Sequence, residues 1–375
     1  MSGVALLGPT PELAFDEPVS LSGYTDTRSP LSPLLVDAPV SRSDYTDIDK
    51  WPGLIDVMGK SLVDAAHPVH AARCLAHGST DPVVARACSL RGVVTETDLT
   101  EFVSDVIDIA VALNQNSPNE VVTVILEGCS HIGKSIAGQK AILLLTKGVW
   151  GGSTPPAAGL GESRHHSIPC FYVEAGATVG PVSLLVEICR FGYIPADEKT
   201  RPGTLMRRLR ENFRRMGTVV VVIDDAHCLA AAKDGKMANQ LKHMITGLPV
   251  TFVFIGMDMS ESALLSTQYD HGYQSSRQIE ERRLRIPAEE LAVYAKSDPA
   301  WPWSLQAVAS QVHLLDGSEA ANVFTSKTNC DAIHGVTGGK LGAANKLIRV
   351  AGQLALATPH WSFNQALTCA SRLVS

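Results

Sequence analysis

An eight-residue turn at positions 128–135, which reads Gly-Cys-Ser-His-Ile-Gly-Lys-Ser, limits this chain to few possible folds. It matches in full the pattern Gly, four variable residues, Gly, Lys and then Ser or Thr, whose backbone N–H groups surround phosphate oxygens. The apolar run at 121–126 has strand character, and the stretch Lys134–Thr146 favours a helix. A phosphate site requires a strand that delivers the loop and a helix that leaves it. The turn therefore predicts a nucleotide-binding α/β protein.

Each fixed position of this loop has a chemical role. Lys134 is expected to reach the β- and γ-phosphates of ATP, and Ser135 to hold Mg²⁺ through its hydroxyl. Gly128 and Gly133 let the backbone approach where a Cβ would collide. The residues expected to surround ATP are Gly128, Cys129, Ser130, His131, Ile132, Gly133, Lys134 and Ser135. His131 is either a phosphate contact or an exposed loop residue without a role, because the motif leaves its position variable.

A second apolar run, Val219–Ile223, is β-branched throughout and ends in Asp224 and Asp225. Such an unbroken run indicates a strand buried on both faces of a parallel sheet, and we expect it to lie beside the strand before the loop. Ligands bind at the carboxyl ends of such strands. Asp224 is therefore expected to bind Mg²⁺ through water, and Asp225 to orient the water that attacks ATP. The alternative is that the pair begins a loop or caps a helix.

A third strand is predicted at Val250–Gly256, after a helical stretch at Met237–Thr246. This alternation of strands and helices is typical of P-loop ATPases with an additional strand, where a polar residue near the strand end senses the γ-phosphate. Asp258 is the nearest polar side chain, but its charge would repel phosphate. We therefore interpret Asp258 as a turn residue.

Six segments follow one another along the chain after its first quarter. They are GCSHIGKS, IPCFYVEAG, VVVVIDDAHCL, LPVTFVFIGMD, EERRLRIP and HGVTGGKLGAANKLIRVAGQLAL. Their order and spacing resemble the TniB/TnsC-type AAA+ ATPases of transposons, over roughly residues 95–375. The resemblance implies an AAA+ P-loop NTPase, a parallel αβα sandwich with a C-terminal helical lid, that binds ATP and Mg²⁺. It also implies a homo-oligomer that assembles on double-stranded DNA in its ATP form and couples a target-selection protein to a transposase.

The family pattern also bears on the hydrolysis of ATP to ADP and phosphate. Family members commonly carry Asp-Glu where this chain has Asp224 and Asp225. Asp225 is shorter than glutamate by one methylene, so its carboxylate lies further back. Hydrolysis is then expected to be slow or lost while binding survives. Arg282 and Arg283 stand where the family places an arginine that acts in trans, and a solvated charged patch is the alternative. Lys340 is either a sensor of the nucleotide or a surface lysine.

The charge of the chain restricts how it binds nucleic acid. A formal net charge of -6 argues against a protein that coats DNA through bulk charge. The stretch 201–215, however, predicts an arginine-rich helix whose apolar side carries Leu205, Leu209 and Phe213. This helix either contacts the phosphates of DNA without reading sequence or is a solvated face of the core.

The composition divides the chain into four parts. Residues 1–50 are rich in Pro, Ser and Asp and predict a flexible, partly disordered arm, which a helical N-terminal segment follows at 51–115. The nucleotide-binding core is expected at 116–290 and the helical lid at 291–375. Apolar runs of only strand length, the absence of a signal-peptide pattern and scattered cysteines lead us to expect a cytoplasmic protein without a membrane span.

Three local patterns predict further details. A helix at Thr95–Asn114 is expected to bury the apolar side formed by Leu99, Phe102, Val103, Val106 and Ile107. Ser362 and Gln365 have capping-box spacing, which predicts a last helix at Phe363–Leu373. Trp301 and Trp303 are expected in a connector between core and lid, either as packing anchors or as platforms on which bases stack.

The most consistent interpretation is an ATP-binding AAA+ regulator of DNA transposition. Two other classes of protein stay open. One is a STAND-type signalling scaffold that assembles with nucleotide but without DNA, which the Asp224-Asp225 pair and a weak sensor would suit. The other is a P-loop kinase that acts on a small molecule as a monomer.

Overall fold

The computed structural model describes residues 98–116, 121–149, 167–175, 180–231, 236–259, 283–310, 312, 320–358 and 360–374. These residues belong to two compact units, a sheet unit that ends at Ala292 and a helical unit that begins at Val293. The predicted arm at 1–50, most of the predicted segment at 51–115 and Arg282 lie outside the described residues. No helix within the described ranges has the length and apolarity needed to cross a membrane.

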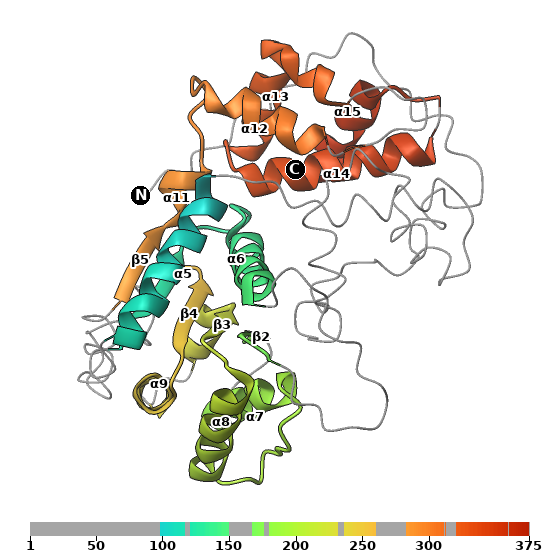
Figure 1. Ribbon diagram of the computed structural model, residues 1–375. Coiled ribbons are helices and arrows are strands. Elements are labelled where there is room, and N and C mark those ends of the chain that lie inside the picture. Colours follow the sequence, from blue (N-terminus) through green and yellow to red (C-terminus); the bar gives the residue numbers. More distant parts are fainter. Residues whose placement is uncertain are drawn as a thin grey trace, which may run out of the picture. The chain divides into compact units, whose positions relative to one another are not determined.

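Five strands form a parallel sheet in the described part of the sheet unit, in the order β2-β3-β4-β1-β5. They are β1 (Thr123–Glu127), β2 (Cys170–Glu174), β3 (Val220–Asp224), β4 (Thr251–Gly256) and β5 (Arg283–Pro287). Figure 1 labels β2, β3, β4 and β5. Every residue of β1, β3 and β4 is buried, as expected for apolar strands covered on both faces. The parallel sheet predicted from the sequence is confirmed.

The expected position of the strand that ends in Asp224 is wrong. β4 separates β3 from β1, and its Val253 lies in register with Val222 of β3 on one side and Val124 of β1 on the other. The apolar runs are alike in length and composition, so the sequence does not specify which strand takes the inner position. Because all neighbours are parallel, β1 and β3 still end at the same edge of the sheet.

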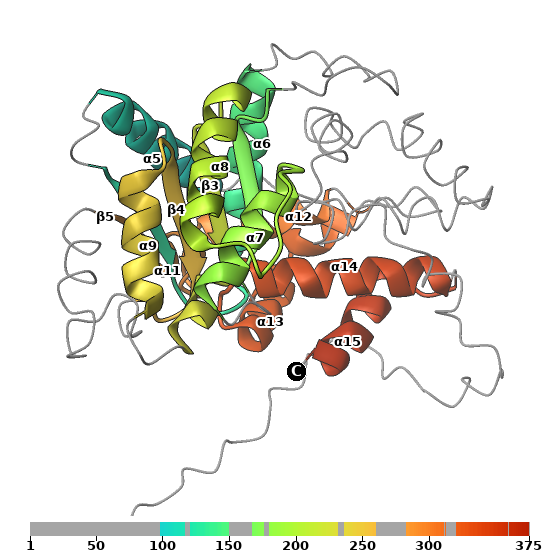
Figure 2. The same ribbon diagram turned by 90° about the horizontal axis from the view of Figure 1, so that it is seen from below.

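Helices cover both faces of this sheet. On one face lie α5 (Asp98–Asn116) and α6 (Lys134–Val149), and on the other α7 (Pro181–Phe191), α8 (Pro202–Met216) and α9 (Lys236–Gly247) (Figure 2). Two adjacent residues of β2 illustrate this division, since successive strand residues point to opposite faces. Tyr172 meets Gln139 of α6. Phe171 packs against Phe191 of α7 and Phe213 of α8.

Helix α5 is amphipathic, although its buried side is narrower than the sequence predicts. Leu99, Val103 and Ile107 are buried against the sheet unit, whereas Phe102 is 42% exposed. One residue turns a helix by about 100°, so Phe102 lies beside the side that Leu99 and Val103 form. The expectation that Phe102 is buried is therefore wrong.

The helical unit contains α12 (Ala300–Ala309), η6 (Ala320–Thr325), α13 (Lys327–Thr337), α14 (Leu341–Ala357) and α15 (Phe363–Val374). Trp301 is buried in its core and donates its indole N–H to the carbonyl oxygen of Cys330 at 3.1 Å. Both tryptophans lie in α12 rather than in a connector, and Trp303 is 74% exposed. The capping box is confirmed, because Ser362 and Gln365 exchange hydrogen bonds of 2.9 Å and 3.3 Å between backbone N–H groups and side-chain oxygens.

Candidate functional site

The phosphate-loop motif joins β1 to α6. β1 ends at Glu127 and α6 begins at Lys134, so the motif residues form the connecting loop and the first turn of the helix. The backbone takes positive φ values at His131 (63°) and at Gly133 (99°). A φ near 99° is strained for any residue with a Cβ, which explains the glycine at position 133. His131 is exposed.

The side chain of Lys134 folds back into the loop that precedes it. Its Nζ donates to the carbonyl oxygens of Gly128 and Cys129, at 2.7 Å and 2.6 Å, and only 8% of the residue is exposed. Burial lowers the pKa of Lys134, while nearby acidic groups, among them Cys129 and Asp224, act in the opposite direction. The chain thus holds an amine inside a loop whose residue types suit phosphate oxygens.

Asp224 and Asp225 lie at the carboxyl end of β3, at the edge where the loop leaves β1. Asp224 is 1% exposed, its Oδ1 accepts the backbone N–H of Asp225 at 2.9 Å, and its Oδ2 accepts the hydroxyl of Tyr172. Asp225 is half-buried, has a φ of 53° and precedes η5 (Ala226–Ala231). Both carboxylates act on the pKa of Lys134. The structure therefore brings the predicted amine and the two predicted carboxylates to one edge of the sheet.

The residue types at this edge suit Mg²⁺. Ser135 occupies the first turn of α6, next to Lys134. Mg²⁺ prefers oxygen ligands and is commonly bound through one or two carboxylates together with water and phosphate oxygens. Ser135 and Asp224 supply a hydroxyl and a carboxylate of this kind. Within the described ranges, no group of three His, Cys, Asp or Glu side chains is arranged to hold a metal ion.

Three residues at this edge do not follow from any sequence motif. The amide of Gln139 donates to the hydroxyl oxygen of Tyr172 at 3.0 Å, and Tyr172 in turn donates to Asp224. Glu289 belongs to α11 (Ala288–Ala292), and its Oε1 accepts the backbone N–H of Cys129 at 2.7 Å. The sequence does indicate the elements that carry two of these residues, since β2 has an apolar pattern and α11 directly follows β5. Neither signal indicates which side chain reaches the loop.

Of the two arginines that the family resemblance singles out, Arg283 lies within the described residues and Arg282 does not. Arg283 begins β5 in register with Thr123, the first residue of β1, so it lies at the end of the strands opposite to the loop. The Nη1 atom of Arg283 is buried. Arg285 forms an ion pair with Glu127 at 3.1 Å. A role of Arg282 or Arg283 in a neighbouring subunit stays a prediction.

The two side chains considered as sensors have different surroundings. Asp258 lies in the turn after β4 with a φ of 46°, a conformation that Asp tolerates better than most residues. This position agrees with its interpretation as a turn residue. Lys340 precedes α14 in the helical unit and forms an isolated bridge with Val293. Its role as a sensor stays a prediction.

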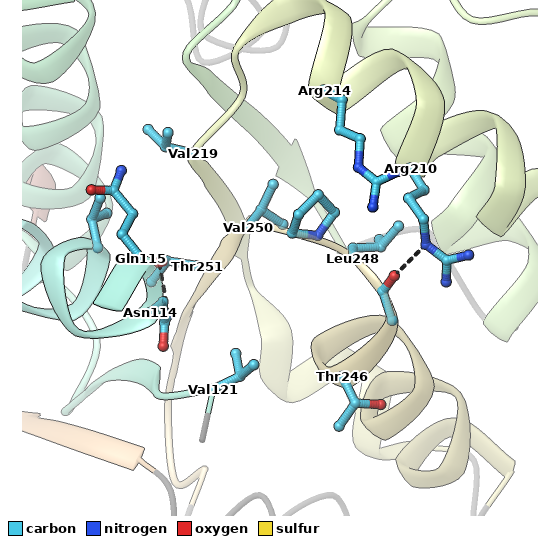
Figure 3. A pocket seen from close by; sticks show the side chains of 13 residues that line it. Asn114, Gln115, Val121, Arg210, Arg214, Val219, Thr246, Leu248, Val250 and Thr251 are labelled. Atoms are coloured by element: carbon cyan, nitrogen blue, oxygen red, sulfur yellow. Dashed lines mark hydrogen bonds between the residues drawn. The ribbon is translucent and has the colours of Figure 1, made fainter. Parts of the chain in front are cut away.

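A pocket of about 410 Å³ lies at the amino-terminal ends of the strands (Figure 3). The phosphate loop leaves β1 at the opposite, carboxyl end. Val121, Val219 and Val250, which precede β1, β3 and β4, line the pocket together with the last turns of α5, α8 and α9. Arg210 extends from α8 and donates its Nε–H to the carbonyl oxygen of Gly247 at 2.8 Å. Arg210 therefore caps the carboxyl end of α9.

Helix α8 matches the arginine-rich helix predicted at 201–215, and Leu205, Leu209 and Phe213 are buried as expected. Its arginines differ in their surroundings. Arg208 donates to the carbonyl oxygen of Pro195, and Arg210 to that of Gly247. The other arginines of α8, which are Arg207, Arg214 and Arg215, are exposed.

Comparisons with known proteins agree with this architecture. A family model described as an AAA domain matches residues 122–264. The solved ORC2 protein of Aeropyrum pernix, in ADPNP–ADP complexes, has a TM-score of 0.51 at 14% identity, with 73% of this chain and 67% of that chain covered. Cdc6p of Pyrobaculum aerophilum has a TM-score of 0.44 at 15% identity, with 70% of this chain and 63% of that chain covered. No curated protein matches the sequence.

The family match and the similarity to the ORC2 protein concern the fold. The family match contains β1, the phosphate loop, β3 and β4, which are the elements that form the candidate site. The AAA+ P-loop fold predicted from the sequence is thereby confirmed. At such low sequence identity the structural similarity does not assign an activity or a partner to this chain.

Proposed function

We propose that this chain is an ATP-binding AAA+ regulator of DNA transposition. In this proposal it forms a homo-oligomer with ATP on double-stranded DNA and couples that DNA, through a target-selection protein, to a transposase. The observation that carries the nucleotide part is Lys134, held inside the loop with Asp224 and Asp225 nearby. The transposition part rests on the resemblance of the six sequence segments to TniB/TnsC-type ATPases.

ATP binding uses the loop and the start of α6. The backbone N–H groups of the loop and the helix N-terminus face the phosphates, and Lys134 exchanges its carbonyl partners for phosphate oxygens. Ser135 and Asp224 hold Mg²⁺, which neutralises phosphate charge when it is bound. Asp225 orients the attacking water. Arg282 or Arg283 of a neighbouring subunit completes the site in trans.

Turnover is slow relative to binding in this proposal, because Asp225 is one methylene shorter than the glutamate common in the family. A long-lived ATP state then keeps the oligomer assembled on DNA. Hydrolysis or exchange of the nucleotide ends that state. ATP occupancy is therefore a switch between assembly and release.

The exposed arginines of α8 support contact with DNA. Arg207, Arg214 and Arg215 present guanidinium groups to solvent, and such groups attract phosphates without reading base sequence. The formal net charge of the chain is -6, so attraction to DNA has to come from a local surface of this kind.

Size-exclusion chromatography with and without a non-hydrolysable ATP analogue, and with and without duplex DNA, tests the proposal. We expect a large species that requires the analogue and is favoured by DNA. Lys134→Ala is expected to abolish it, whereas Lys147→Ala, in the last turn of the same helix, is expected to retain it. Assembly that is indifferent to DNA would instead support a signalling scaffold. Nucleotide binding without any assembly would support a small-molecule kinase.

A further inference from the structure

Tyr172 is completely buried in β2, and its hydroxyl connects two elements of the candidate site. The hydroxyl donates to Oδ2 of Asp224 and accepts a hydrogen bond from the amide of Gln139 at 3.0 Å. Tyr172 is in register with Val222, two residues before Asp224 on the neighbouring strand. Residues two apart on a strand point to the same face, which brings the phenol alongside the carboxylate.

This contact leaves the Asp224 carboxylate little freedom to rotate. Its Oδ1 accepts the backbone N–H of Asp225 at 2.9 Å, so each oxygen has a donor on a different strand or turn. Gln139, at the other end of the connection, belongs to the helix that begins with Lys134 and Ser135. The hydrogen bonds therefore link the element that carries the serine to the strand that carries the aspartate.

We propose that Tyr172 is a positioning residue for Mg²⁺: it orients the Asp224 carboxylate and, through Gln139, holds it in register with Ser135. This inference rests on the proposed ATP and Mg²⁺ binding. Mg²⁺ demands nearly ideal octahedral geometry, so small rotations of a carboxylate that binds its water ligands weaken the metal site. Groups that orient metal ligands commonly alter metal affinity 10- to 100-fold when they are removed.

Tyr172→Phe tests the proposal, because it removes one oxygen and keeps the ring. Binding of a fluorescent ATP analogue is titrated in EDTA and again over a range of Mg²⁺ concentrations. We expect affinity in EDTA to stay within about twofold of wild type and the half-saturating Mg²⁺ concentration to rise about tenfold. An unchanged Mg²⁺ dependence, with or without a lower melting temperature, overturns the proposal.

Two further variants make the test specific. Gln139→Leu leaves the bond between Tyr172 and Asp224 and removes the link to α6, so we expect a smaller rise in half-saturating Mg²⁺. If Tyr172→Phe does not fold, Gln139→Leu tests the positioning role by itself. An unchanged Mg²⁺ dependence in Gln139→Leu then overturns the proposal. Tyr294→Phe removes the hydroxyl of a buried tyrosine in the helical unit and is expected to leave the Mg²⁺ dependence unchanged.

Failure of the inference and failure of the proposed function give different results. If wild type binds the analogue with a clear Mg²⁺ dependence that Tyr172→Phe and Gln139→Leu share, only the positioning role is lost. If wild type binds no nucleotide in either condition, the proposed function is wrong and the role of Tyr172 falls with it.

Discussion

At the scale of single residues, Lys134 has the clearest consequence for binding. Its amine lies among loop carbonyl groups and acidic side chains, which stabilise a positive charge. We predict that Lys134→Ala lowers the affinity for Mg-ATP about 100-fold, because a hydrogen bond to a charged group contributes up to about 3 kcal/mol. Isothermal titration calorimetry measures the change. Lys147→Ala is the control, and equal affinities for both variants would contradict the proposed site.

The pKa of Lys134 also predicts a pH dependence. Burial lowers this pKa from the usual 10.5, so the folded protein loses the amine proton at a lower pH than the unfolded chain. Through that window the unfolded chain binds more protons, and the contribution of Lys134 to folding stability rises with pH. ATP affinity changes in the opposite direction, because the neutral amine attracts phosphate less. We expect wild-type affinity to fall as the pH rises toward 10.5.

Lys134→Arg provides the comparison for this pH effect. A guanidinium stays charged throughout the range, so the affinity of Lys134→Arg is expected to depend less on pH, whatever its absolute value. Calorimetry over a pH series measures both proteins. Parallel pH profiles would show that another group causes the dependence.

In the proposed function, Asp225 has to meet two requirements that conflict. Its φ of 53° lies in the left-handed region, which Asp and Asn tolerate better than glutamate, while water activation favours the longer side chain of glutamate. We predict that Asp225→Glu raises the ATPase rate and lowers the free energy of unfolding by about 1 kcal/mol. A phosphate-release assay and urea denaturation measure the two effects. Asp225→Asn keeps the backbone preference and is expected to reduce the ATPase rate. Equal ATPase rates for wild type and Asp225→Glu would mean that the native carboxylate is already well placed.

At the scale of elements, α6 approaches β4 closely at one glycine. A Cβ on Gly138 would lie 2.4 Å from Cδ1 of Ile255, which is 1% exposed and has little room to move. Alanine is a better helix former by about 1 kcal/mol, but overpacking a core costs about 1–3 kcal/mol. We therefore predict that Gly138→Ala lowers the free energy of unfolding.

Gly148 of the same helix is the matched control, because nothing lies within 4 Å of a Cβ there. Gly148→Ala is expected to stabilise the protein by up to about 1 kcal/mol. Urea denaturation is expected to separate the two variants by about 2 kcal/mol. Equal stabilities would show that the contact between α6 and β4 relaxes without cost.

The elements around the loop could be predicted because their signals are local. Val219–Ile223 is a continuous apolar run, Val250–Gly256 is apolar apart from Thr251, and the loop motif lies between a strand and a helix in sequence as in space. The position of β4 between β1 and β3 could not be predicted from the sequence, because strand order depends on which faces of the elements pack together. The bond between Tyr172 and Asp224 likewise depends on the register of two strands that are distant in the sequence.

At the scale of the whole molecule, the proposed contact with DNA has to be consistent with the net charge of the chain. The chain carries a formal net charge of -6, whereas Arg207, Arg214 and Arg215 place three exposed cations on α8. An excess of negative charge elsewhere repels DNA at long range, so the proposed DNA binding would take its affinity from short-range ion pairs. Binding of this kind is expected to weaken steeply with salt and to ignore base sequence.

The salt dependence of the affinity for DNA tests whether these arginines contact phosphates. Each phosphate contact contributes about 0.9 to the slope of log affinity against log salt concentration. Replacing Arg207, Arg214 and Arg215 together by alanine is therefore expected to reduce the slope by up to about 2.7, measured by fluorescence anisotropy with duplex DNA and the ATP analogue. Arg190→Ala, an exposed arginine of α7 paired with Glu187, is expected to leave the slope unchanged. If the triple variant kept the wild-type slope, DNA would have to bind another surface. A loss in Arg190→Ala of about a third of the triple variant's loss would show that exposed arginines act regardless of their position.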